Sequence, residues 1–251
     1  MYFHYTNIPA VYNIVKTGKV WFSSLAFMND EMEGMDLHQV LAEVLELKYG
    51  SEKCKKTLEL IETTIETYLR FQMSFSASTL KDDISQWRAY THLGQGVCVE
   101  FGEGFIQDEG ITKVECLYDI SAKKTAIIQD RHLKANDVTI NGLLESHDDI
   151  QKYVSAIIQT LVRFKNASFS PEKEVRWVLS LSGVTDPKAR LMYRPHRLGL
   201  TTYQEVKVDL TKVKSITLGP QLSKQNLKTF EDFLIEHGCS GYVAKSKVTL
   251  R

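Results

Sequence analysis

The chain has 251 residues, close to the upper limit for one hydrophobic core, so a single domain is expected. Hydrophobic residues make up 43% of it and charged residues 25%, which is the composition of a globular protein and excludes a fibrous repeat or a disordered chain. Lys and Arg together number 31, as do Asp and Glu. The overall charge therefore does not indicate a nucleic-acid partner, which would be recruited by a positive field.

Cysteine and histidine spacing gives no sign of a metal site. The four cysteines lie far apart without a Cys-x-x-Cys pair, and the seven histidines are scattered. The N-terminus has a strand pattern in place of a signal peptide, and no apolar run is long enough to span a bilayer. The sequence predicts a cytoplasmic protein with no membrane partner and no metal.

The first residues predict a strand-helix-strand unit. Asn7 is a suitable N-cap for the helix and Gly18 a suitable stop. Because side chains alternate along a strand, His4 is expected on the same face as Thr6. The predicted ranges are strand Tyr2 to Thr6, helix Ile8 to Lys16 and strand Val20 to Ser23.

Residues 35–70 predict a helical hairpin inserted into the domain. Two apolar stripes with helical spacing are separated there by Gly50 and Ser51. Just before this stretch lies a polar motif with the pattern of a helix N-terminus, formed by Asn29, Asp30 and Glu33. This interpretation is better supported than the alternative, in which the acids form a catalytic pair.

The rest of the chain mixes strands and helices without regular alternation. This predicts the α+β class, with a mixed, mostly antiparallel sheet. The predicted strands are 71–76, 97–101, 112–117, 173–179, 205–210, 213–218 and 242–245; the predicted helices are 85–90, 122–133, 144–165 and 223–238; a basic loop is expected at 187–199.

Three groups of side chains are candidates for a site, each with an ordinary structural alternative. Glu174 and Arg176 lie two apart on a strand and so share a face, as a surface ion pair or as a functional pair. Trp87 and Tyr90 lie on one side of a short helix, as core residues or as a ligand platform. Arg194 belongs to a loop that is either solvated or binds phosphate.

Short motifs along nearly the whole chain, from Tyr2 to about Arg251, resemble an uncharacterised bacterial family known only as a domain of unknown function. The chain also resembles, remotely, ADP-ribosyltransferases of the histidine-tyrosine-glutamate type and their phage-defence relatives. That likeness rests on the opening His-Tyr-Thr strand, the hydroxyl-bearing strand at Ser23 and the late strand with Glu174. The family motifs are Phe-His-Tyr-Thr, Trp-Phe-Ser-Ser, Phe-Met-Asn-Asp-Glu-Met-Glu, Phe-Ser-Ala-Ser, Gln-Trp-Arg-Ala-Tyr, Gly-Val-Cys-Val-Glu-Phe, Lys-Glu-Val-Arg-Trp and Ile-Thr-Leu-Gly-Pro.

The second resemblance implies an ADP-ribosyltransferase-like core that uses NAD as its substrate. His4 would hold the ribose, and Glu174 would stabilise the ribosyl cation as nicotinamide leaves. Ser23 stands where the related enzymes have tyrosine. The other implied cofactor contacts are Thr6 beside His4, the rings of Tyr5, Trp87 or Tyr90 on nicotinamide or adenine, and Arg176 or Arg194 on the pyrophosphate.

Three functions stay open at this point. The first is an ADP-ribosyltransferase or NAD glycohydrolase, acting on a macromolecular acceptor or on water as a toxin or phage-defence effector. The second is a sensor module that binds a nucleotide or a partner without turnover. The third is a nuclease, for which Asp30, Glu33 and Glu174 would have to form a metal cluster.

Overall fold

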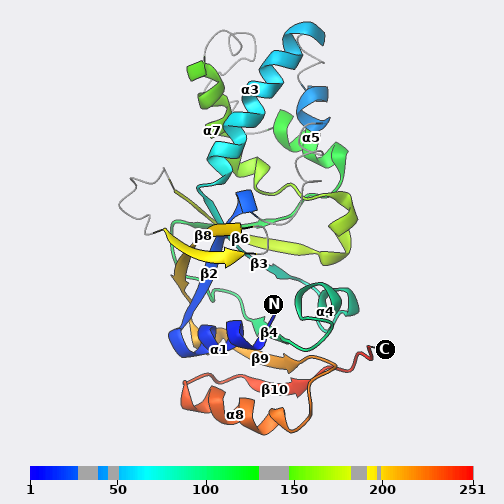
Figure 1. Cartoon of the computed structure of the whole chain (residues 1–251), viewed down its shortest axis with the longest axis vertical. Helices are drawn as coiled ribbons and strands as arrows, with labels where there is room; N and C mark the ends of the chain where they lie inside the picture. The colour runs from blue at the N-terminus through cyan, green and yellow to red at the C-terminus, as the bar shows by residue number, and fades with distance from the viewer. Residues whose placement is uncertain (28–38, 45–50, 130–146, 182–190, 197–198, 251) are drawn as a thin grey trace.

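The computed structural model describes residues 1–27, 39–44, 51–129, 147–181, 191–196 and 199–250. A twisted sheet occupies the middle of an elongated molecule, with a group of helices at one end and a strand-helix layer at the other (Figure 1). Asn29, Asp30 and Glu33 lie outside the described residues, and so do Arg190 and Arg197 of the expected basic loop.

The N-terminal strand-helix-strand unit is confirmed. The Asn7 side chain accepts a hydrogen bond from the Ala10 backbone N–H at 2.8 Å, as an N-cap does. Gly18 ends the helix in the left-handed conformation with φ 63°, which glycine adopts without steric cost. The unit consists of β1 (Tyr2–Thr6), α1 (Ile8–Thr17) and β2 (Lys19–Ser24).

The described part of the chain contains a ten-stranded sheet, in the order β10-β9-β4-β1-β3-β2-β8-β7, with β6 on β3 and β5 on β6. Among the described strands every pair is antiparallel except β9 with β10, so the predicted α+β class with a mixed, mostly antiparallel sheet is confirmed. The further strands are β3 (Gln72–Ser78), β4 (Val97–Phe101), β5 (Ile111–Glu115), β6 (Glu174–Ser180), β7 (Met192–His196), β8 (Gly199–Lys207), β9 (Val213–Leu218) and β10 (Tyr242–Lys245).

The sheet branches at β3. One edge of β3 pairs with β6 along its whole length. The other edge pairs with β1 at Ser78 and with β2 at Ser74 and Met73. Ser76 lies between these two contacts, where β1 and β2 part from the same edge of β3. The described sheet is open at this fork between β1 and β2, and a cleft lies there.

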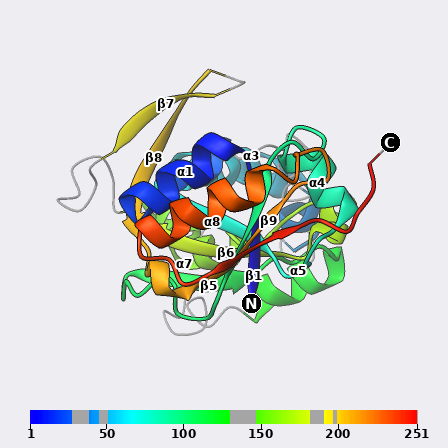
Figure 2. The same cartoon turned by 90° about the horizontal axis from the view of Figure 1, so that it is seen from below.

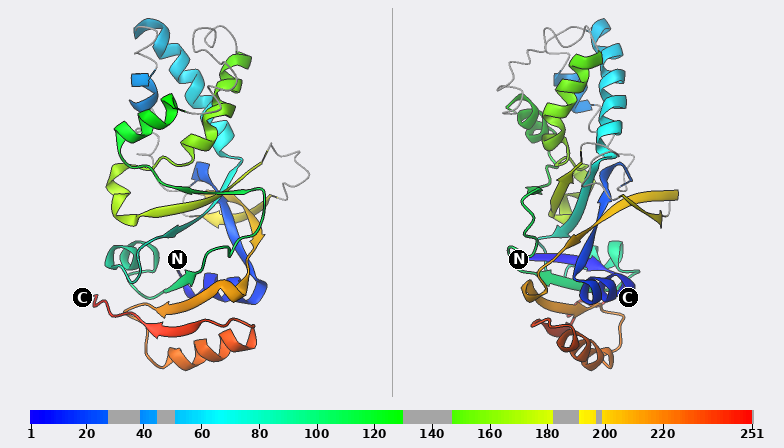
Figure 3. Two further views of the ribbon diagram at one scale, coloured as in Figure 1. Left: turned by 180° about the vertical axis from the view of Figure 1, so that it is seen from behind. Right: turned by 90° about the vertical axis from the view of Figure 1, so that its left-hand side faces the viewer.

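The helical end has a hydrophobic core of its own, formed by side chains such as Leu41, Ile65 and Ile157. The segment predicted as an insertion supplies residues 39–44, which are helical, and α3. Helices from far along the chain complete this core (Figure 3). No helix of the described part of the chain is both long and apolar enough to cross a membrane. The helices concerned are α3 (Ser51–Leu69), α5 (Ile120–Ile128) and α7 (His147–Leu161).

The opposite end packs helices against the other sheet face. There α1 and α8 lie side by side (Figure 2), with Tyr12 stacked on Phe233 at 5.4 Å between ring centroids. The large core beneath contains Phe22, Phe101 and Trp177. Within the described residues, further helical segments are α4 (Ile84–Tyr90), α8 (Asn226–Glu236) and the short 3-10 turns η1 (Leu25–Phe27), η3 (Ala167–Glu172) and η4 (Leu210–Lys212).

A basic loop was expected at 187–199. In the described part of this range the prediction is wrong, because Met192–His196 form the strand β7. β7 pairs with β8 over five residue pairs, and β8 itself begins at Gly199, well before the predicted start. Among the described strands β7 contacts β8 alone, so it is an edge strand, a position that tolerates Pro195. The β7–β8 ribbon projects from the sheet (Figure 2).

Candidate functional site

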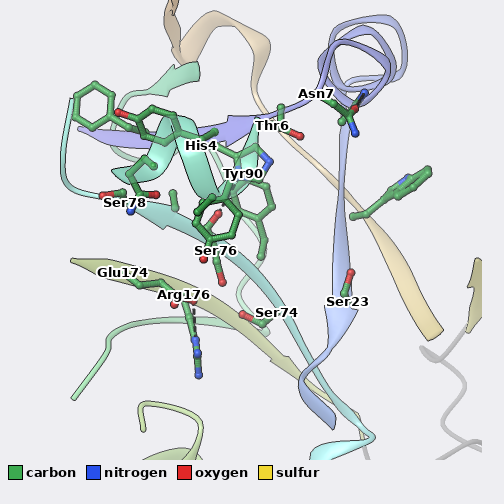
Figure 4. Close-up of a pocket in the computed structure, with 18 of the residues that line it drawn as sticks. His4, Thr6, Asn7, Ser23, Ser74, Ser76, Ser78, Tyr90, Glu174 and Arg176 are labelled. Atoms are coloured by element: carbon green, nitrogen blue, oxygen red, sulfur yellow. Dashed lines mark hydrogen bonds and ion pairs between the residues drawn. The ribbon is translucent and has the colours of Figure 1, made fainter. Parts of the chain in front are cut away.

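A cleft of about 660 Å³ lies at the fork of the sheet. Its walls come from β1, β2, β3 and β6, with α1 at one end and α4 at the rim (Figure 4). It is mostly polar on the β3 side, where serine hydroxyls and charged groups from distant parts of the sequence meet. Among the residues that line it are His4, Thr6, Asn7, Ser23, Ser74, Ser76, Ser78, Gln86, Tyr90, Lys165, Glu172, Glu174, Arg176 and Arg194.

Alternation along β3 produces a row of hydroxyls on the cleft side. Ser74, Ser76 and Ser78 share one face, because every second residue of a strand does, while the intervening Phe75 enters the main core. The Oγ atoms of Ser74 and Ser76 are buried and have no hydrogen-bond partner among the described residues. Buried polar atoms are normally paired, so these two hydroxyls are suited to a polar ligand.

The strand register brings Glu174 and Arg176 to the same face as the serines. Glu174 is the cross-strand partner of Ser78, and Arg176 is the partner of Ser76. Directly opposed residues of an antiparallel pair point to the same side of the sheet. The sequence spacing that placed the two charges on one face is confirmed, and the pairing with β3 directs that face to the cleft.

His4 fills the gap at the fork with its ring. Its Nδ1 lies 2.9 Å from the Ser76 carbonyl oxygen, and its ring centroid is 4.5 Å from that of Phe75. A carbonyl oxygen only accepts, so Nδ1 carries the proton and Nε2 is left as an acceptor. Burial lowers the pKa of His4 to about 4, and the bond to Ser76 offsets this only in part. His4 is therefore neutral at physiological pH.

The depressed pKa of His4 predicts acid-sensitive folding. As pH falls from about 6.5 to about 4, the unfolded chain takes up a proton at His4 that the native chain does not, so stability present above this window is lost within it. Urea unfolding near pH about 7 and about 4.5 should show a smaller acid loss for His4→Gln than for the unmodified protein. Equal losses in both proteins would contradict the neutral, buried state of the ring.

Glu174 is the centre of a buried ion cluster. Its side chain is 5% exposed, and Arg176 Nε donates to its Oε1 at 2.8 Å, while Lys165 Nζ donates to Oε2. Burial by itself raises the pKa of Glu174, but the charges of Arg176 and Lys165 outweigh it and hold this pKa at about 2. Glu174 is therefore a fixed carboxylate at any physiological pH.

Arg176 ties this cluster to the helical end of the molecule. Its Nη1 donates to the backbone oxygens of Val162 at 2.9 Å and Phe164 at 3.3 Å, just beyond α7. The guanidinium is 3% exposed and its donors point into the protein. Arg176 orients Glu174, and its Nε and Nη1 donors are taken up by this network and are not available for the pyrophosphate contact expected for Arg176.

A second carboxylate, Glu172, was missed by the sequence reasoning. Its Oε2 accepts from Lys165 Nζ at 2.5 Å and its Oε1 from the Tyr90 hydroxyl at 2.7 Å. Burial, then the neighbouring charge of Glu172, raise the pKa of Tyr90 above its ordinary value. The position of Glu172 two residues before Glu174 was a signal in the sequence; nothing in it pointed to Lys165, which bridges the two acids.

Two predicted aromatic contacts are placed differently from the others. Trp87 is fully buried, packs edge-on against Tyr5 and donates from its indole to Asp82 at 2.8 Å. Its side chain therefore lies on the buried side of α4 and does not line the cleft. Tyr5 borders the cleft, but its hydroxyl is engaged by the Leu80 carbonyl and the Asp83 N–H. Tyr90 does face the cleft, because it lies on the outward side of α4 (Figure 4).

No group of three or more His, Cys, Asp or Glu side chains within the described ranges is arranged to hold a metal ion. Glu172 and Glu174 already share the Lys165 ammonium. The described part of the cleft presents serine, histidine and arginine side chains, which form hydrogen bonds with hydroxyl and anionic groups.

Comparison with known proteins identifies one domain. Residues 86–177 match the family described as a protein of unknown function (DUF2971). This span includes Glu174 and Arg176 and ends within β6; it does not include His4 or Arg194. Searches of curated proteins and of solved structures gave no match.

Proposed function

We propose that this protein binds NAD in the cleft and breaks the bond between nicotinamide and ribose, passing ADP-ribose to a macromolecule or to water. The observation that carries the proposal is the meeting of His4 and Glu174 in one cleft, although 169 sequence positions separate them from the first strand to β6. The remote likeness to ADP-ribosyltransferases assigned reacting roles to these same two residues.

The chemistry uses what these side chains can do. As the C1′–N bond breaks, its electron pair leaves with nicotinamide, and positive charge develops on the ribose ring. The carboxylate of Glu174, which is already ionised, stabilises that charge. The neutral His4 ring accepts a hydrogen bond at Nε2 from a ribose hydroxyl. A hydroxyl or water then forms the new bond to C1′ and releases its proton.

The Lys165 bridge is compatible with this role of Glu174. Lys165 Nζ contacts both Glu172 and Glu174, so it keeps a counterion at Glu172 if it releases Glu174. One Glu174 oxygen then faces the ligand while Arg176 retains the other. Glu172 thus lowers the free-energy cost of freeing a Glu174 oxygen for the cationic transition state, because the buried Lys165 ammonium stays paired with Glu172.

The test is a direct assay of the bond. The purified protein is incubated with NAD, and free nicotinamide is measured by chromatography, alone and with candidate acceptors such as total cell protein and nucleic acid. We expect nicotinamide release above the spontaneous rate, with ADP-ribose recovered either free or attached to an acceptor. Absence of release under all these conditions contradicts the proposed activity.

The second candidate is a binding module that recognises a nucleotide or a partner in the same cleft without turnover. The observation that favours it is the Glu174 carboxylate, both of whose oxygens are already bonded to buried cations, as in a structural network. Calorimetry distinguishes the two functions when combined with the assay: binding of NAD without release of nicotinamide supports the module, and binding with release supports the enzyme.

A further inference from the structure

Arg194 lies at the end of the cleft formed by the outer strands. It belongs to β7, opposite Thr201 of β8, and β8 in turn pairs with β2, where Tyr203 is opposite Ser23. These partners share the face that lines the cleft. Arg194 reaches back across β8, and its Nη2 donates to Ser23 Oγ at 2.9 Å.

An aromatic wall holds the guanidinium in place. Its Cζ lies 5.6 Å from the centroid of the Trp21 ring, and Trp21 in turn contacts Tyr203, with 4.6 Å between their centroids. A guanidinium plane over an aromatic face gains from cation–π attraction and keeps its edge donors free for other partners. The stack therefore fixes the direction in which Arg194 donates.

The charge of Arg194 has no counterpart among the described residues. No described carboxylate forms an ion pair with it, and its Nε is buried without a hydrogen-bond acceptor. Burial lowers the pKa of Arg194, which shows that its charged form is poorly solvated in this position. Arg176 differs, because its Nε and Nη1 already donate to Glu174 and to two carbonyl oxygens. A buried charged donor left unpaired costs free energy, which an anion would recover.

We propose that Arg194 and Ser23 form a phosphate subsite, and that the Trp21 ring, which packs against Tyr203, is the wall against which the attached nucleoside lies. The inference deepens the proposed function and rests on it for the identity of the ligand. It assigns the diphosphate to Arg194 and not to Arg176. The ligand then has a direction: its reacting ribose lies between His4 and Glu174, and its phosphates lie toward the β7–β8 ribbon.

Calorimetry with inorganic pyrophosphate and with ADP tests the subsite, since neither probe contains the bond that the enzyme would break. Arg194→Gln should weaken the binding of both probes at least about tenfold, because a charge-assisted hydrogen bond is lost. The affinity of Arg194→Lys for both probes should lie between those of the unmodified protein and Arg194→Gln, because an ammonium keeps the charge and loses the forked geometry. Arg70→Gln, which removes an exposed arginine outside the cleft, is the matched control and should bind as the unmodified protein does.

The aromatic wall has a separate readout. Trp21 is 40% exposed, whereas the other two tryptophans, Trp87 and Trp177, are 0% and 6% exposed, so ADP should change the fluorescence of Trp21 in particular. Trp21→Leu should weaken ADP binding about tenfold more than pyrophosphate binding, because ADP loses base stacking in addition to the support that the Trp21 ring gives Arg194.

The outcomes separate this inference from the proposed activity. Pyrophosphate binding that is lost in Arg194→Gln supports the subsite, even if NAD is not cleaved. Nicotinamide release together with unchanged pyrophosphate binding in Arg194→Gln overturns the subsite and leaves the activity standing. Failure of the unmodified protein to bind either probe also overturns it. If Arg194→Gln does not fold, Arg194→Lys and Ser23→Ala carry the same comparison.

Discussion

Glu174→Gln should lower nicotinamide release from NAD at least about 100-fold, the usual cost of removing one preorganised electrostatic contact to a developing charge. Gln has nearly the same shape as Glu but keeps only one acceptor oxygen and places an amide donor against Lys165 or Arg176, so the free energy of unfolding of the variant is measured beside its rate. Rates are measured at neutral pH, where the carboxylate of the unmodified protein is fully ionised because its pKa is about 2. An unchanged rate in a folded variant would remove Glu174 from the proposed reaction.

A second buried carboxylate provides the control for this measurement. Glu100 is 7% exposed on β4, accepts from Ser215 Oγ at 2.6 Å and from Lys81 Nζ at 3.0 Å, and does not line the cleft. Glu100→Gln should therefore disturb a buried ion pair and leave nicotinamide release unchanged. If both variants lose release in proportion to their loss of stability, Glu174 acts through the fold and not on the ligand.

Arg176→Met should lower the free energy of unfolding by about 3–5 kcal/mol, because removing one partner of a buried pair leaves the others uncompensated. The change deprives Glu174 of its Oε1 partner and leaves two carbonyl oxygens, at Val162 and Phe164, without their donor. Methionine fills much of the arginine stem volume, so packing loss contributes little. Urea unfolding followed by circular dichroism measures the effect.

Arg88→Met is the matched comparison for stability. Arg88 lies exposed on α4, and its replacement should change the free energy of unfolding by no more than about 0.5 kcal/mol. A small effect of Arg176→Met, similar to that of Arg88→Met, would mean that the buried cluster does not hold β6 to the segment after α7. The expected large difference would show that Arg176 links the cleft to the helical end.

Local patterns predicted most of the elements correctly. The Asn7 cap and the Gly18 stop determine α1 by contacts within a few residues. The alternation of polar and apolar side chains predicts β3, and the apolar run after Gly96 predicts the buried strand β4. The predictions failed where the pairing with another strand decides whether a segment becomes a strand. The segment of β7 has little strand pattern and contains Pro195, and it becomes a strand because β8 offers it an edge.

Part of the candidate site could also be read from the sequence. The spacing of Glu174 and Arg176 showed two charges on one strand face, which is a local property. It did not show which way that face points, because this depends on the register with β3. Trp87 and Tyr90 illustrate the same limit: both lie on α4, yet the packing of the helix buries the first and leaves the second at the cleft.

The sequence by itself determined the strand-helix-strand entry, the mixed α+β class and the charged pair of β6, because each depends on periodicity, caps or spacing over a few residues. Only the tertiary structure decided that His4 and Glu174 share a cleft and that Lys165 bridges Glu172 and Glu174. It also decided that the buried Nε of Arg194 has no acceptor among the described residues. The physical reason is the fork at β3. Two strands leave one edge of β3 there, and the gap between them brings together side chains whose distance along the chain carries no information about their distance in space.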